Sequence, residues 1–297
     1  MKRFCAIIYV LLAAAGLYAQ DAASVAMPFS PLPRNVRTLS LGGVTAADDA
    51  AFRCLGSESL DLSASWFSWA PKGVKSNDIN LDAFARIGRR FALGAQFGLD
   101  SGARYDIYDS QGSKSGFFSP KDMIFKLGAA YRITPSISAG ASFRYLYNQL
   151  AAKVSYSAVA ADITASMQFA GARVFAGVTN LGGSVKAADG TAFGLPTAAS
   201  VAGDYRLALG EMHALSACAQ FDLFFKGGIR AGVGAEYGFK DLAFLRLGYS
   251  YGGKSAFPSY FSAGLGVKFS GFKLDATYLL GSTAIGGTLG VGLGYCF

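Results

Sequence analysis

The sequence predicts an all-β protein: a transmembrane antiparallel β-barrel of about fourteen strands with an N-terminal hatch segment inside it. Three observations predict this class. Apolar and polar or small residues alternate with a period of two almost without interruption from Ser59 onward. The connections between the alternating stretches are short and long in turn. The composition is poor in charge, and no apolar run after the N-terminus is long enough for a spanning helix.

Composition narrows the class of protein. Only 15% of the 297 residues are charged and 38 are glycine, whereas soluble domains carry about 25% charged residues. A surface that faces lipid explains this deficit. The formal net charge is +8, but the basic residues are dispersed singly, so we expect no nucleic-acid partner. Polyanionic outer-membrane lipid is the expected external partner.

Residues 1–19 read as a signal peptide. Lys2 and Arg3 form a basic start, Ala6–Gly16 is apolar but too short to span a bilayer, and cleavage is expected after Ala19. Three cysteines remain at wide, irregular spacing, which fits neither a disulfide framework nor a zinc site. We therefore expect no metal and no cofactor.

Residues 20–57 show no strand pattern and are expected to form the hatch. Met27–Pro33 contains three prolines and should be extended. We expect Leu39 to Phe52 to fold back into the periplasmic mouth, where burial of the apolar residues stabilises it. A sharp turn at the glycine pair would let the acidic pair meet lumen arginines. The expected hatch residues are Leu39, Leu41, Gly42, Gly43, Asp48, Asp49 and Phe52.

Residues 58–297 are expected to form the barrel. The strands are predicted, in order, at Leu60–Trp69, Ile79–Ile87, Phe91–Leu99, Met123–Tyr131, Ile137–Tyr147, Ser157–Phe169, Ala172–Val178, Leu195–Leu209, Ala214–Phe225, Ile229–Tyr237, Leu242–Tyr251, Tyr260–Phe269, Phe272–Leu280 and Ile285–Phe297. Short turns, such as Gly88–Arg90 and Ala170–Gly171, follow the even-numbered strands. Longer polar loops, notably Ser101–Lys121 and Asn180–Gly194, follow several odd-numbered ones. Outer-membrane barrels place short turns in the periplasm and long loops outside.

The charges indicate which strand faces line the lumen. Lysine or arginine facing lipid at the bilayer midplane would cost roughly 2–4 kcal/mol each, so the charged faces must point inward. Glu236 and Arg246 should pair across a hairpin. Three phenylalanines also point inward, and they would either contact an apolar ligand or pack the hatch. The expected lumen residues are Phe84, Arg86, Arg144, Asp162, Phe175, Asp204, Arg206, Phe224, Arg230, Glu236, Arg246, Lys273 and Asp275.

The last strand carries a second signal. Its large apolar residues alternate with very small ones, and it ends on Tyr295 and Phe297, where an interfacial aromatic girdle is expected. A C-terminal aromatic residue on such a strand resembles the membrane-insertion signal of bacterial outer-membrane barrels. That resemblance implies the barrel-assembly machinery as a partner.

Catalytic motifs are absent from the sequence. The only histidine, His213, is predicted in a periplasmic turn, and GVGLG at Gly290–Gly294 reads as glycine on alternate lumen positions. A lipid hydrolase would need His213 beside an inward serine. The inward carboxylates could be acid/base groups, but interior ion pairing explains them more simply. We expect that the protein is not an enzyme.

Several short motifs, in order along the chain, resemble the FadL-like outer-membrane barrels and their PorV/PorQ branch. They are RTLSLGGVTAADDAA from Arg37, FRYLYNQL at Phe143–Leu150, VTNLGG at Val178–Gly183, LPTAASVAGDY at Leu195–Tyr205, and the long blocks Ala231–Gly253 and Phe261–Tyr278. The family resemblance implies fourteen strands, a hatch, and the outer membrane of a Gram-negative-type (diderm) bacterium. One departure is Phe52–Gly56, where the family usually has Asn-Pro-Ala.

The resemblance implies two alternative functions. A FadL-like barrel would pass or bind hydrophobic small molecules, so its partner would be an apolar ligand. A PorV/PorQ-like barrel would be a scaffold for type IX secretion or cell-surface attachment, so its partners would be secretion-system proteins that contact the long loops. Apolar side chains in the lumen favour the first alternative.

Overall fold

The computed structural model of the chain describes residues 25–45, 50–56, 59–69, 75–187, 189–226, 228–252, 258–281, 285 and 287–296. The predicted signal peptide and Phe297 lie outside these residues. In the described part, no helix is both long and apolar enough to cross a membrane.

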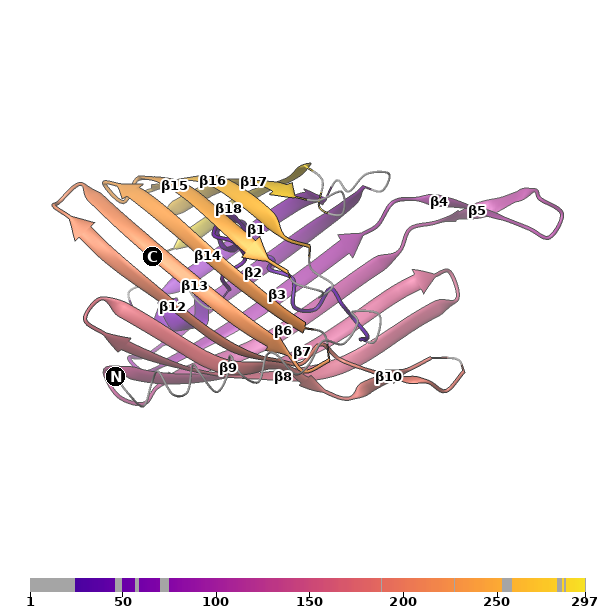
Figure 1. Cartoon of the computed structure of the whole chain (residues 1–297), viewed down its shortest axis with the longest axis horizontal. Coiled ribbons are helices and arrows are strands. Elements are labelled where there is room, and N and C mark those ends of the chain that lie inside the picture. Colours follow the sequence, from indigo (N-terminus) through magenta and orange to yellow (C-terminus); the bar gives the residue numbers. More distant parts are fainter. Residues whose placement is uncertain are drawn as a thin grey trace.

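The predicted fold class is confirmed, because fourteen antiparallel strands close into a barrel (Figure 1). Each strand pairs with its neighbour along the barrel, and the last strand closes on the first from Asp61–Cys296 to Ser68–Leu289. The barrel strands are β1 Leu60–Trp69, β2 Ser76–Ile87, β3 Phe91–Ser101, β6 Lys121–Arg132, β7 Ile137–Ala151, β8 Val154–Phe169, β9 Ala172–Gly182, β12 Ala198–Leu209, β13 His213–Phe224, β14 Gly228–Phe239, β15 Ala243–Tyr251, β16 Tyr260–Phe269, β17 Phe272–Gly281 and β18 Gly287–Cys296.

Two of the predicted long loops contain strands that the sequence did not predict. The connection from β3 to β6 forms the hairpin β4 Tyr105–Tyr108 and β5 Lys114–Phe118, and that from β9 to β12 forms β10 Ser184–Lys186 and β11 Ala192–Gly194. The β4–β5 hairpin projects well beyond the barrel rim (Figure 1). Both lie at the end opposite the short turns, which is the extracellular end.

The short turns have the backbone that tight hairpins require. Residues Ala170 and Gly171 have φ of 42° and 82°, and Ser270 and Gly271 have φ of 50° and 86°. Positive φ at both central residues matches the right-handed twist of the flanking strands. This geometry explains how strands such as β8 and β9 connect through two residues at the periplasmic end.

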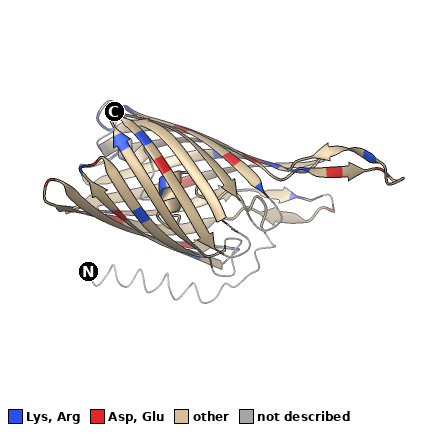
Figure 2. Cartoon of the chain, turned by 90° about the horizontal axis from the view of Figure 1, so that it is seen from above, with Lys and Arg blue, Asp and Glu red and all other residues tan. Residues whose placement is uncertain are grey.

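The two faces of the barrel differ as the alternation predicts. Large apolar side chains cover the outside, and Leu265 and Phe269 are 61% and 72% exposed. The charged residues are spread along many strands and not gathered in one patch (Figure 2). Closure of the barrel pairs the backbone groups of the strands with one another, so they need no water. The apolar outer face is suited to lipid, and the protein is embedded in the outer membrane.

The hatch lies inside the barrel, where Figure 1 draws it in indigo behind the strands. It comprises an extended stretch, α2 Val36–Ser40 and α3 Ala50–Gly56. The stretch ahead of Leu39 reaches beyond the periplasmic mouth that was expected for Leu39–Phe52, because Val25 bridges Gly194 at the extracellular side and Met27 packs against Leu146. The described hatch therefore runs from the extracellular end down to α3 in the periplasmic half.

Candidate functional site: the lumen and its hatch

The centre of the hatch rests on a wall of glycines in β14, β15 and β16. Gly42 has φ of 71°, and a Cβ atom there would lie 2.5 Å from the carbonyl oxygens of Val233 and Tyr249. A Cβ at Gly234 would lie 2.7 Å from the Leu41 carbonyl oxygen, and one at Gly264 would collide with Ser40. The alternating glycines thus remove side chains where the hatch backbone touches the barrel.

Apolar and polar contacts hold α2 on this side of the lumen. Val36 and Leu39 are buried against Phe67, Tyr260 and Leu279. The Ser262 hydroxyl donates to the Ser40 carbonyl at 3.1 Å and accepts from the Gly42 N–H at 3.3 Å. The Ser40 carbonyl lies at the C-terminal end of α2, where no following turn of helix bonds to it, and the barrel hydroxyl supplies its partner.

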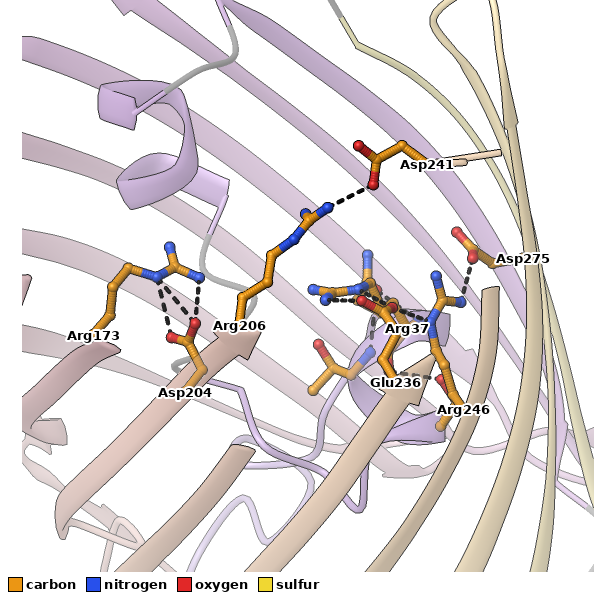
Figure 3. A network of polar contacts seen from close by, with 11 residues as sticks. Arg37, Arg173, Asp204, Arg206, Glu236, Asp241, Arg246 and Asp275 are labelled. Atoms are coloured by element: carbon orange, nitrogen blue, oxygen red, sulfur yellow. Dashed lines mark hydrogen bonds and ion pairs between the residues drawn. The ribbon is translucent and has the colours of Figure 1, made fainter. Parts of the chain in front are cut away.

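A buried ionic network joins the hatch to the barrel (Figure 3). Glu236 accepts from Arg37 of α2 at 2.9 Å and from Arg246 at 2.6 Å, and Arg246 also donates to Asp275 at 2.5 Å. The predicted Glu236–Arg246 pair is therefore present. Arg37 was not predicted as a member, because it lies 199 residues from Glu236 in the chain.

Two barrel arginines hold the proline-rich stretch. Arg144 donates to the Ser30 carbonyl at 2.9 Å, and Arg230 donates to the Pro31 carbonyl at 3.1 Å. Each arginine is oriented by a strand carboxylate: Asp162 lies 2.6 Å from Arg144, and Asp222 lies 2.8 Å from Arg230. Prolines prevent regular backbone pairing, so these charge-assisted bonds satisfy the extended segment instead.

A row of carboxylates lies at the extracellular end of the lumen and was not predicted from the sequence. Asp78, Asp100 and Asp122 occupy neighbouring register positions on β2, β3 and β6. Arg34 of the hatch donates to Asp78 at 3.2 Å and to the Asn80 side chain at 3.2 Å. The alternation does show that each aspartate faces inward, but only the strand register shows that they are adjacent.

The remaining predicted lumen residues also lie on inward faces. Phe84, Phe175 and Phe224 are buried. The polar ones lie nearer the periplasmic end, where Arg86 donates to Ser59, Arg173 pairs with Asp204, Arg206 pairs with Asp241, and Lys273 pairs with Asp61 (Figure 3 shows the Arg173 and Arg206 pairs). Arg206 is more than half exposed at the rim.

Of the expected hatch residues, Leu39, Leu41, Gly42, Gly43 and Phe52 are buried inside the barrel. Asp48 and Asp49 lie outside the described residues, so their expected contact with lumen arginines stays a prediction. Thr45, just before them, donates to the Gln220 side chain at 3.1 Å. Tyr295 packs its ring on Phe272 at 5.0 Å between centroids.

The hatch divides the lumen into two cavities. The inner cavity, which we call the chamber, measures about 230 Å³ and is bordered by hatch residues 30–35 and by inward residues of β1 to β14. The second, the vestibule, measures about 870 Å³ and lies on the periplasmic side. Phe52 and Phe175 border both cavities, as do Asn35, Asp61 and Ser63, and the two rings meet edge to face with centroids 5.6 Å apart.

The histidine has surroundings unlike those of a catalytic base. His213 begins β13, and its Nδ1 atom lies 2.6 Å from the hydroxyl of Tyr237. Its ring also contacts Phe239. Both neighbours are aromatic residues near the periplasmic rim. The hydroxyl beside His213 belongs to a tyrosine, whereas a serine hydrolase would need a serine hydroxyl there.

No family model and no curated protein matches the sequence. Solved structures do resemble the fold. The chain is similar to the Ralstonia pickettii toluene transporter TbuX at a TM-score of 0.62 and 14% identity, covering 90% of this chain and 99% of that one. For the Pseudomonas putida toluene transporter TodX the values are 0.62 and 11%, covering 89% and 98%.

A Pseudomonas aeruginosa FadL homologue is also similar, with a TM-score of 0.50 and 9% identity over 94% of this chain and 98% of that one. At these identities the likeness shows a shared barrel fold. The neighbours are transport channels and a FadL homologue, in line with the expected FadL-like architecture.

Proposed function

We propose that this protein carries small hydrophobic molecules across the outer membrane, through the lumen and past the hatch. The observation that carries the proposal is the division of the lumen into a chamber and a vestibule with buried aromatic side chains between them. A general porin for hydrated solutes would instead need a continuous polar channel. The structural similarity to TbuX and TodX, both toluene transporters, supports the same proposal.

The dimensions of the chamber favour a small cargo. Its volume of about 230 Å³ is below the range of roughly 300–1,000 Å³ that drug-sized ligands fill. A cavity of about 150 Å³ already accommodates benzene. By volume, the chamber therefore has room for a compact molecule of one aromatic ring.

Uptake into proteoliposomes tests the proposal. Purified protein is reconstituted, and the entry of radiolabelled toluene into vesicles that trap it enzymatically is compared with protein-free vesicles and with vesicles holding an unrelated porin. We expect faster capture only with this protein. Equal rates in all three preparations, together with no apolar molecule found by mass spectrometry in detergent-extracted protein, would overturn the proposal.

A scaffold for secreted or surface-attached proteins is the second candidate. The β4–β5 hairpin favours it, because the hairpin projects beyond the barrel (Figure 1) and carries two exposed aromatic residues, Tyr108 and Phe117. Exposed aromatic residues are common anchors of protein interfaces. The test is a pull-down from the native membrane with full-length protein and with a variant whose residues 105–118 are replaced by a short turn. Loss of a stoichiometric protein partner in the variant would favour the scaffold.

A further inference from the structure

An apolar belt crosses the lumen between the chamber and the vestibule. Its barrel members are Phe84, Ala92, Ala130, Phe175 and Ala202, which are all buried. Helix α3 completes the belt with Ala51, Phe52, Cys54 and Leu55. The belt therefore combines inward positions of β2, β3, β6, β9 and β12 with one turn of the hatch.

Charged zones lie on either side of this belt. On the chamber side, Asp162 pairs with Arg144 at 2.6 Å and with Lys126 at 3.4 Å. On the vestibule side, Arg173 pairs with Asp204 at 3.1 Å. A hydrated solute could meet polar groups in either cavity, whereas the belt itself presents only apolar side chains.

Helix α3 spans the partition in a single turn. Ala51 borders the chamber, Leu55 borders the vestibule, and Phe52 borders both. The Phe52 ring fits against small residues, since a Cβ atom at Gly140 would lie only 3.1 Å from its Cζ atom. Together with the edge-to-face contact to Phe175, this fit fills the space between α3 and the strands β7 and β9.

We propose that the contact between Phe52 and Phe175 is the polarity filter of the lumen, which passes compact apolar molecules and blocks ions and hydrated solutes. An apolar molecule exchanges one apolar neighbour for another at the belt. An ion must give up water there without gaining a polar partner, and hydrophobic constrictions gate channels in this way. The passing half of this statement rests on the proposed function, whereas the blocking half stands without it.

Planar-bilayer conductance tests the blocking half. The variants Phe52→Ala, Phe175→Ala and the double variant are compared with wild type, and Phe52→Leu is included because it keeps an apolar filling. Phe224→Ala is the matched control, since Phe224 is also buried and borders the chamber but not the vestibule. Heat-modifiable migration on gels verifies that each barrel is folded.

We expect conductance to rise several-fold in both single alanine variants and most in the double variant, with Phe52→Leu and Phe224→Ala close to wild type. Conductance that is equal in wild type and the double variant would overturn the filter, as would an equal rise in Phe224→Ala. Toluene capture is measured on the same preparations. If wild type captures no toluene while the alanine variants conduct, the transport function fails and the blocking contact remains.

Discussion

The two sides of the lumen contact the hatch through different kinds of surface. The wall of β14 to β16 offers glycines, and the hatch backbone lies directly on it with carbonyl oxygens at contact distance. The wall of β2 to β12 offers aromatic rings, paired charges and a cavity. The first wall holds the hatch backbone by close packing, whereas the second holds it through side chains such as Arg144 and leaves a cavity beside it. If the proposed transport function holds, a cargo would move along the second wall.

Removing the hatch from both walls should have the largest effect. Deletion of Ser40–Phe52 leaves every barrel strand in place but removes the glycine contacts and the Phe52 ring. We expect a folded, heat-modifiable barrel whose conductance in planar bilayers far exceeds that of the full-length protein. Equal, low conductance would show that something other than residues 40–52 closes the lumen.

The second-largest effect is expected from breaking the ionic network around Arg246. Arg246 is buried between Glu236 and Asp275, so Arg246→Ala would leave two carboxylates short of a partner. Breaking a buried pair costs about 3–5 kcal/mol, and we expect a loss of that order in urea unfolding from lipid vesicles. The rim pair supplies the control: Arg206→Ala should change the unfolding free energy by less than about 1 kcal/mol, because both partners are exposed.

A side chain on the glycine wall should act on the hatch more than on the barrel. Gly264→Ala places a methyl group against Ser40, and such overpacking costs about 1–3 kcal/mol. We expect faster hydrogen exchange at the Leu39 and Leu41 amides, with barrel strands unchanged. The matched control on the other side is Gly128→Ala, whose added Cβ would lie 3.3 Å from Ser142 and touch no hatch atom. Equal exchange in both variants would contradict a docking role for the glycines.

The smallest effect should come from the cap of α2. Asn35 accepts from the Arg37 N–H at 2.9 Å and from the Thr38 N–H at 3.4 Å. Asn35→Ala should weaken the hatch locally by about 1 kcal/mol, and Asn35→Asp should restore the cap. The measurement is again amide exchange within residues 36–42. No change in Asn35→Ala would mean that contacts with the barrel alone determine this helix.

The strands could be predicted from sequence because their alternation is a local property. Leu60–Trp69 and Tyr260–Phe269 match the predicted bounds, and the other barrel strands differ from them mainly at their ends. The β4–β5 hairpin was missed because it is half exposed on both faces and so lacks a clear alternation. The inward direction of charged residues followed from the cost of placing them in lipid.

The barrel partners of the hatch could not be predicted, because they are distant from it in the sequence. Nothing local links Arg37 to Glu236, or Ser40 to Gly264. The sequence predicts only that the glycines of the last strands are small lumen residues. The structure shows why small residues are needed on β14 to β16, where the hatch backbone lies against the wall. Phe52 was expected in the hatch, but its role beside Phe175 depends on where two cavities meet.

The seam between β1 and β18 has a consequence for how the molecule is assembled. The hatch precedes the first strand, and most contacts of α2 are with β15, β16 and β17, which are synthesised near the end. Contacts so far apart in the chain form late, after a large loss of chain entropy. Leu39 and Val44 therefore remain unburied until the final strands arrive. Closing the seam last encloses the hatch without threading it, so barrel closure and hatch burial are expected to be one kinetic step.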